Sequence, residues 1–205
     1  MSLRGRTGLF GGTFNPIHVG HLQVAEEAWR QCGLRRIVFL PTGYPPHRAV
    51  DEGISAETRY TMVRLAVEGD ARFTVSRFEV DRVGPCYTVD TIAALNEAHR
   101  EGVAYIVGAD IFAQIETWHD WQRLLTSCPF IVAPRPGVPA ATFHRPPFDQ
   151  AEVHFLEMPT IAVSSSEVRR RYREGLSTLG MVPPAVDRWI RINGLYGVAP
   201  PPKGG

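Results

Sequence analysis

The segment Gly11–His21 constrains the fold and chemistry of this 205-residue chain more than any other part. It reads GGTFNPIHVGH and follows the short apolar run Leu9-Phe10. His18 and His21 are three residues apart, so on a helix they share one face. The pattern predicts a strand, a glycine turn and a helix whose first turn carries two imidazoles.

This arrangement favours a site for a polyphosphate. The paired glycines Gly11 and Gly12 are predicted to let the backbone turn tightly and bring amide N–H groups close to a ligand. The helix N-terminus supplies partial positive charge, and the histidine rings supply N–H donors. The alternative is a pair of ordinary capping or core histidines. Neither the dinucleotide fingerprint G-x-G-x-x-G nor the Walker loop is present in this segment.

Composition narrows the class of protein. Hydrophobic residues make up 44% and charged residues 21% of the chain, values typical of a soluble globular protein. The net charge of +1 argues against a broad nucleic-acid-binding face. Cys32, Cys86 and Cys128 form no C-x-x-C pair, which favours reduced thiols in a cytoplasmic protein. No signal peptide and no apolar run of about 18 residues is present, so we expect no membrane partner.

Short apolar runs alternate with helical patterns along the chain. The predicted strands are Gly8–Gly11, Arg36–Pro41, Phe73–Ser76, Val103–Gly108, Phe130–Ala133 and Val153–Glu157. The predicted helices are His18–Gln31, Ser55–Glu68, Val89–Arg100, Trp121–Thr126, Ser165–Glu174 and Pro184–Asn193. We expect one α/β domain over residues 1–199, with a mainly parallel sheet covered by helices on both faces, and a frayed tail at 200–205.

A second anion site is predicted at the start of a late helix. Ser164 and Glu167 fit a capping box, so the first turn exposes N–H groups and the hydroxyls of Ser165 and Ser166. Arg169 lies in the next turn and suits bidentate contact with phosphate. The alternative is a well-capped helix with a solvated basic face.

Three further segments lie near predicted strand ends or helix starts. His47 and Arg48 follow a proline-rich stretch that either presents them to an anion or forms a plain surface turn. Thr88 is a predicted N-cap, and the free amides there either hold a carboxylate or only begin the helix. Arg135 either reaches a phosphate or is an ordinary exposed arginine.

The segment Gly108-Ala109-Asp110 ends a predicted strand, where the carboxylate is able to accept ribose hydroxyls or assist a metal. Trp118 and His119 follow later in the sequence, and Trp118 offers a flat face for stacking on an aromatic ring. The alternative for Trp118 is a place in the core.

The Gly11–His21 segment resembles the signature of the nucleotidyltransferase superfamily that shares the His-x-Gly-His motif. The further resemblance is to bacterial nicotinate-nucleotide adenylyltransferases, and it extends over nearly the whole chain. It is carried by the blocks Pro41–Arg48, Tyr87–Thr91, Gly108–Trp118, Arg135–Gly137, Ser164–Arg171 and Asn193–Tyr196. This resemblance implies a Rossmann-like fold, Mg²⁺ as cofactor, and transfer of AMP from ATP to nicotinate mononucleotide with release of pyrophosphate.

The resemblance also implies roles for individual residues. It assigns catalysis to His18, His21 and Arg169. It assigns ATP binding to Gly11, Gly12, Thr13, Phe14, His18, His21, Gly108, Asp110, Ser165, Ser166 and Arg169. It assigns nicotinate mononucleotide to His47, Arg48, Thr88, Trp118, His119 and Arg135, with Trp118 stacking on the pyridine ring and the amides of Thr88 and His119 receiving its carboxylate. No protein metal ligand is assigned.

Three other functions stay open at this stage. A sister transferase would use phosphopantetheine or another phosphorylated acceptor, but Trp118 and the segment around Thr88 disfavour it. A tRNA-charging enzyme shares a similar histidine signature, but the length of 205 residues leaves no room for a tRNA-binding module. A nucleotide-sensing module without turnover is disfavoured because both histidines and Arg169 are retained. The sequence leaves open whether the chain forms a homo-oligomer.

Overall fold

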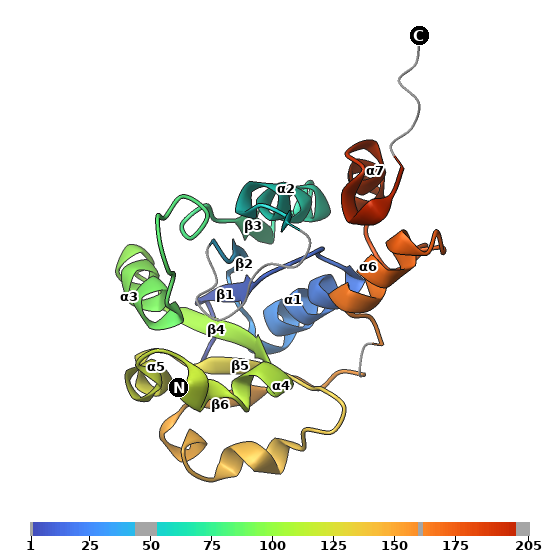
Figure 1. The fold of residues 1–205 in the computed structure, drawn as a ribbon. Coiled ribbons are helices and arrows are strands. Elements are labelled where there is room, and N and C mark those ends of the chain that lie inside the picture. The colour runs from blue at the N-terminus through green and yellow to red at the C-terminus, as the bar shows by residue number, and fades with distance from the viewer. Residues whose placement is uncertain (1, 44–52, 160–161, 200–205) are drawn as a thin grey trace.

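A central parallel sheet of six strands organises the chain (Figure 1). The computed structural model describes residues 2–43, 53–159 and 162–199. The strand order is β3-β2-β1-β4-β5-β6, and every neighbouring pair is parallel. The strands are β1 (Thr7–Gly12), β2 (Arg36–Pro41), β3 (Phe73–Val75), β4 (Val103–Gly108), β5 (Phe130–Ala133) and β6 (Val153–Phe155).

Helices cover both faces of this sheet, as parallel strands joined by crossovers require. The α-helices are α1 (Val19–Cys32), α2 (Ala56–Val67), α3 (Thr88–Ala98), α4 (Ala109–Phe112), α5 (Trp121–Ser127), α6 (Ser165–Arg173) and α7 (Pro184–Ile192). Short 3-10 turns are η2 (Ile115–Thr117), η3 (Ala140–His144), η4 (Phe148–Gln150) and η5 (Leu195–Gly197). Helices α1, α2, α6 and α7 pack on one face, and α3, α4 and α5 on the other (Figure 1).

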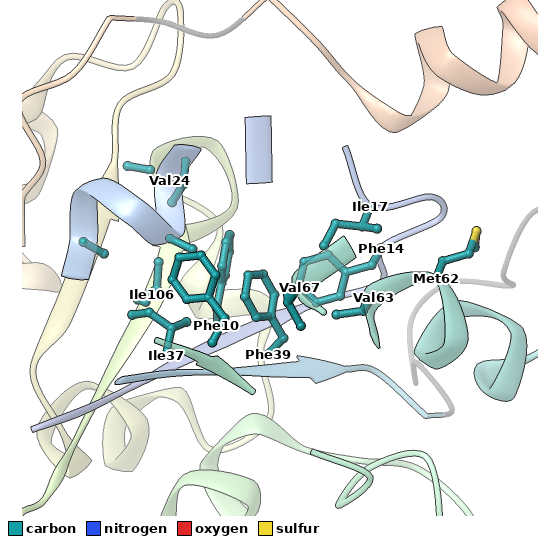
Figure 2. Packing of buried hydrophobic residues seen from close by; sticks show 14 of the residues in the cluster. Phe10, Phe14, Ile17, Val24, Ile37, Phe39, Met62, Val63, Val67 and Ile106 are labelled. Atoms are coloured by element: carbon teal, nitrogen blue, oxygen red, sulfur yellow. The ribbon is translucent and has the colours of Figure 1, made fainter. Parts of the chain in front are cut away.

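Strand alternation divides the core into two layers. Phe10 and its register partner Phe39 face the layer under α1 and α2, where they pack near Phe14 and Val63 (Figure 2). The preceding pair in the same register, Leu9 and Val38, belongs to the opposite layer, because successive side chains on a strand point to opposite faces. Nearly continuous apolar strands therefore fill both layers, as expected for a sheet buried on both sides.

The strand order creates a switch point between β1 and β4. From β1 the chain builds β2 and β3 on one side, then crosses to β4 on the other side. The carboxyl ends of β1 and β4 lie next to each other, so the connections that follow them diverge. Open α/β sheets bind ligands in the crevice at such a point.

The expected fold class is confirmed. All six predicted strands and all six predicted helices are present, with ends that differ from the prediction by two residues or fewer. The short helix α4 and the 3-10 turns were not predicted, because three- to five-residue turns carry no measurable hydrophobic period. The domain limit at residue 199 stays a prediction, and the tail 200–205 lies outside the described residues.

The prediction that Gly11 and Gly12 form a tight turn is wrong, whereas their predicted contact with ATP stays a prediction. Both residues lie inside β1, and neither has a positive φ. A side chain at Gly11 would place its Cβ 2.1 Å from the hydroxyl oxygen of Tyr105 on β4. Phe14 is the residue after β1 that takes the left-handed conformation, with φ of 49°. Glycine is therefore needed for close packing of β1 against β4, and the turn itself is made by a buried aromatic residue.

The substitution Gly11→Ala tests this packing argument. The added methyl group has to displace the Tyr105 side chain, which costs about 1–3 kcal/mol of unfolding free energy. Tyr105→Phe removes the hydroxyl oxygen, which is the atom nearest to the added methyl group. Gly11→Ala should therefore cost less unfolding free energy in the Tyr105→Phe background than in the wild type. Urea unfolding of the four proteins measures both effects. Equal losses from Gly11→Ala with and without the Tyr105 hydroxyl would contradict the assignment.

Candidate active site

Two adjoining cavities open at the carboxyl ends of β1 and β4, with volumes of about 270 and 280 Å³. Five residues line both of them: Gly11, Gly12, Thr13, Gly108 and Ile111. The site is therefore one cleft with two compartments that share a floor of small residues. A ligand with two separate recognition groups joined by a compact link fits this shape.

The first compartment gathers residues from both ends of the chain. It is lined by residues of the β1–α1 connection, the end of β4 and the start of α6. The predicted ATP-binding residues found there are Gly11, Gly12, Thr13, Phe14, His21, Gly108, Asp110, Ser165, Ser166 and Arg169. The predicted convergence of the histidine segment with Arg169 therefore holds in the structure. Whether these residues bind ATP stays a prediction.

The two histidines form a stacked pair. Their ring centroids are 3.7 Å apart with an interplanar angle of 26°. His21 lines the first compartment, whereas His18 caps α1 and is 3% exposed, behind the ring of His21. The backbone N–H of His18 donates to Nδ1 of His21 at 3.2 Å, so the proton of a neutral His21 ring sits on Nε2.

Burial keeps both imidazoles uncharged near neutral pH. Desolvation, with a smaller contribution from the positive charge of Arg135, lowers the pKa of His18 from 6.5 to about 4. Desolvation also lowers the pKa of His21 well below 6.5, and His18 and Arg135 lower it further. His21 is half-buried and lines the first compartment. The pair therefore offers neutral N–H donors in the ligand-free protein.

Arg169 joins α6 to the connection after β1. Its Nη1 donates to the backbone carbonyl of Asn15 at 2.8 Å. Ser165 at the start of α6 donates its hydroxyl to the carbonyl of Pro16 at 2.9 Å. The hydroxyl of Ser164 accepts from the amide of Glu167, which confirms the predicted N-cap of this helix. The guanidinium of Arg169 and the first turn of α6 are therefore both held against the connection between β1 and α1, which ends at His18.

The same loop is held from two further directions. Arg59 on α2 is fully buried, and it donates to the carbonyl oxygens of Thr13 at 2.8 Å and Gly43 at 3.1 Å. Tyr196 in η5 donates its hydroxyl to Oδ1 of Asn15 at 2.6 Å. Donors from α2, α6 and η5 thus satisfy acceptors along residues 13–16, which turns an irregular segment into a rigid one.

The second compartment is more aromatic. Thr88, Trp118 and His119 line it, as predicted for the pyridine side. Tyr87 also lines it and stacks on the His119 ring, with centroids 4.1 Å apart. Glu79 contributes a buried carboxylate that accepts from the Thr91 hydroxyl at 2.8 Å, and burial raises its pKa. The compartment offers flat apolar faces beside a few buried polar groups.

One prediction about this side needs correction, and the place of another residue is now defined. The N-cap of α3 is Tyr87, and Thr88 is the first helical residue, so the Thr88 amide is one of the first-turn donors without an intrahelical acceptor. Arg135 lines the first compartment and lies 3.5 Å from Asp110, because the end of β5 brings it beside the end of β4. Its predicted contact with nicotinate mononucleotide stays a prediction. His47 and Arg48 lie outside the described residues.

Sequence reasoning missed several residues that shape the cleft. Tyr87 and Glu79 line the second compartment. Arg59 and Tyr196 donate hydrogen bonds to the loop of residues 13–16. Tyr87 and Tyr196 lay inside blocks that carried the resemblance, so their positions were available as a signal. Arg59 and Glu79 look like ordinary charged residues of an amphipathic helix and a loop, and their burial is visible only in three dimensions.

Within the described residues, no group of three or more His, Cys, Asp and Glu side chains is arranged to hold a metal ion. In the same part of the chain, no helix has the length and apolar character needed to cross a membrane. The described cysteines Cys32, Cys86 and Cys128 form no disulfide with one another.

Comparisons with known proteins match this geometry. The family model described as cytidylyltransferase-like matches residues 9–171. A probable nicotinate-nucleotide adenylyltransferase of Saccharopolyspora erythraea is 42% identical over 96% of this chain and 92% of its own length. A protein of the same name from Thermus thermophilus is 43% identical over 93% of this chain and 99% of its own.

A solved structure shares the fold at low sequence identity. The nicotinic acid mononucleotide adenylyltransferase of Plasmodium falciparum, complexed with NaAD, has a TM-score of 0.78 and 16% identity, covering 94% of this chain and 98% of its own. The matched family model and the extended identity to curated relatives lead to one conclusion. This chain belongs to the cytidylyltransferase-like family, within its nicotinate-nucleotide adenylyltransferase branch.

Proposed function

We propose that this protein transfers the adenylyl group of ATP to nicotinate mononucleotide, forming nicotinate adenine dinucleotide and pyrophosphate in NAD biosynthesis. The observation that supports it most directly is the two-compartment cleft with a shared glycine floor at the β1–β4 switch point. Hydrogen-bond donors line one compartment and aromatic faces line the other, which suits a dinucleotide product with its phosphates over the shared floor. Reduced cysteines fit a reducing, cytoplasmic setting.

The reaction needs little covalent help from the protein. A phosphate oxygen of nicotinate mononucleotide attacks the α-phosphorus of ATP, and the bond from that phosphorus to the bridging oxygen of pyrophosphate breaks. The attacking phosphate carries about −1.5 to −2 charge at pH 7, so no general base has to remove a proton. The protein's task is to align the two phosphates and to stabilise charge that develops on the α-phosphate and the leaving group.

We assign that stabilisation to groups in the first compartment. The Nε2–H of His21 and the guanidinium of Arg169 supply donors, and Ser165 and Ser166 add hydroxyls and first-turn amides. His18 supports the orientation of His21 through the stacked ring and its backbone N–H. Arg135, paired with Asp110, adds positive charge on this side of the cleft.

The residues present fit a Mg²⁺ ion that arrives with the triphosphate. Mg²⁺ keeps several waters and takes one or two carboxylates besides phosphate oxygens, so it needs no dedicated protein cage. Asp110 contributes an exposed carboxylate to the first compartment and would hold the ion there. When bound, the ion neutralises charge on the pyrophosphate leaving group.

Recognition of nicotinate is assigned to the second compartment. Trp118 provides the face on which the pyridine ring stacks, and the N-terminal turn of α3 at Thr88 provides donors and partial positive charge for the carboxylate. A carboxamide would turn its NH₂ group toward those donors and leave them without acceptors.

Removing the imidazole of His21 tests the donor role. We expect His21→Ala to lower kcat by about 10²–10³-fold, the scale for loss of one transition-state donor. Steady-state release of pyrophosphate with ATP and nicotinate mononucleotide measures it. Turnover close to that of the wild type would rule out the role assigned to this ring.

Selectivity between acid and amide substrates is the second test. The donors at the start of α3 predict a higher kcat/KM for nicotinate mononucleotide than for nicotinamide mononucleotide, by about 10-fold or more for one mispaired polar group. A pyrophosphate-release screen over both, with phosphopantetheine as a third acceptor, compares them directly. Preference for the amide would contradict the assignment of Thr88, and preference for phosphopantetheine would contradict the proposed function.

The buried histidine pair predicts a specific pH dependence of stability. Because the pKa of His18 falls from 6.5 to about 4 on folding, the unfolded chain binds more protons between these values. The lowered pKa of His18 therefore changes the free energy of unfolding by about 3 kcal/mol. This stabilisation is complete above pH 6.5 and is lost as the pH falls toward 4. Urea unfolding of wild type and His18→Asn from pH 7 to 4 isolates it. Parallel curves for the two proteins would show that His18 is not the group responsible.

A further inference from the structure

The last turn of the chain reaches the active-site loop through one buried hydroxyl. Tyr196 in η5 is 4% exposed, and its Oη donates to Oδ1 of Asn15 at 2.6 Å. The two residues are 181 positions apart in the sequence. This contact fixes the orientation of the Asn15 carboxamide, because only its oxygen end is an acceptor.

Asn15 belongs to the first compartment and is itself a junction. It lines the cavity beside Phe14 and His21, yet only 5% of its surface is exposed. Its backbone carbonyl accepts from Nη1 of Arg169 at 2.8 Å. A continuous chain of hydrogen bonds therefore runs from Tyr196 through Asn15 to the guanidinium to which we assign charge stabilisation.

The backbone at both ends of this contact is strained. Phe14, next to Asn15, has φ of 49°, and Tyr196 has φ of 56°. Large side chains rarely take the left-handed conformation, and residues that do so are held there by the surrounding structure and cluster at functional sites. The ring of Tyr196 stacks on Tyr172 of α6 with centroids 6.0 Å apart, which provides that support.

We propose that Tyr196 is a positioning residue for adenylyl transfer, acting through Asn15 to hold the β1–α1 loop and Arg169 in register with the triphosphate. This inference rests on the proposed function. The two residues through which the hydroxyl acts, Asn15 and Arg169, line the first compartment and not the second. The hydroxyl should therefore affect turnover with ATP and leave recognition of the acceptor unchanged.

The chain offers a matched pair of variants. Tyr196→Phe removes the hydroxyl but keeps the ring, its stacking and its backbone conformation. Tyr172→Phe removes another largely buried hydroxyl of the same C-terminal region, one that donates to Oδ1 of Asp187 at 2.7 Å between α6 and α7. Both variants lose a short hydrogen bond to a side-chain oxygen, but of these two bonds only that of Tyr196 reaches a residue that lines the cleft.

Steady-state kinetics with ATP and nicotinate mononucleotide separates the two roles. We expect Tyr196→Phe to lower kcat about 10-fold with KM for nicotinate mononucleotide within about twofold of wild type, since small misplacements of catalytic groups cost this much or more. Tyr172→Phe should keep kcat within about twofold. A kcat of Tyr196→Phe within twofold of wild type, or an equal loss in Tyr172→Phe, would overturn the inference.

A double-variant cycle provides a second measurement. If Tyr196 acts through Asn15, adding Tyr196→Phe to Asn15→Ala should lower kcat by less than about twofold further, because residues in one network are not additive. If the double variant loses kcat by the product of the two single-variant losses, the inference is overturned. A wild-type protein that releases no pyrophosphate with any acceptor would refute the proposed function instead, so the two failures are distinguishable.

Discussion

The structure depends on how one irregular segment, residues 13–16 between β1 and α1, is held in place. Its carbonyl groups cannot join a helix or sheet ladder, so other donors must satisfy them. Arg59 from α2 and Arg169 and Ser165 from α6 supply these donors, and Tyr196 from η5 donates to the Asn15 side chain. A local loop thus acquires its shape from long-range contacts, and the fold has to be complete before the first compartment of the cleft exists.

The electrostatics of the site follow from the same enclosure. Desolvation leaves the His18–His21 pair uncharged, so the fixed positive charge of the first compartment resides on Arg135 and Arg169. Two stacked imidazolium rings 3.7 Å apart would repel each other strongly in a buried setting. Neutral rings that donate from a rigid position avoid that cost and still meet an anion with N–H groups. The pair is therefore better described as a set of oriented donors than as a cationic pocket.

Much of this architecture was predictable from the sequence because its signals are local. Strand alternation, apolar helix faces and the cap at Ser164 each depend on a few neighbouring residues, and they placed every strand and every helix longer than one turn. The reason for Gly11 was not local, since it depends on Tyr105 across the sheet. The place of Arg135 beside Asp110 was not predictable locally, because the order of β4 and β5 in the sheet decides its neighbours. The buried state of Arg59 had no sequence signal at all.

The C-terminal region lies beyond the part of the chain that the family model matches, yet it contacts the segment between β1 and α1. The matched model ends at residue 171, so it includes the β1–α1 segment and Arg169 but not α7 or η5. The amide of Val19 at the start of α1 nevertheless donates to the carbonyl of Met181 at 2.9 Å, and Tyr196 closes on Asn15. The helix that carries the histidines and the loop before it are thus both fixed by residues beyond the shared model. A phosphoryl transfer site works by position more than by covalent chemistry, and for this reason we propose a positioning role for a segment that touches no substrate.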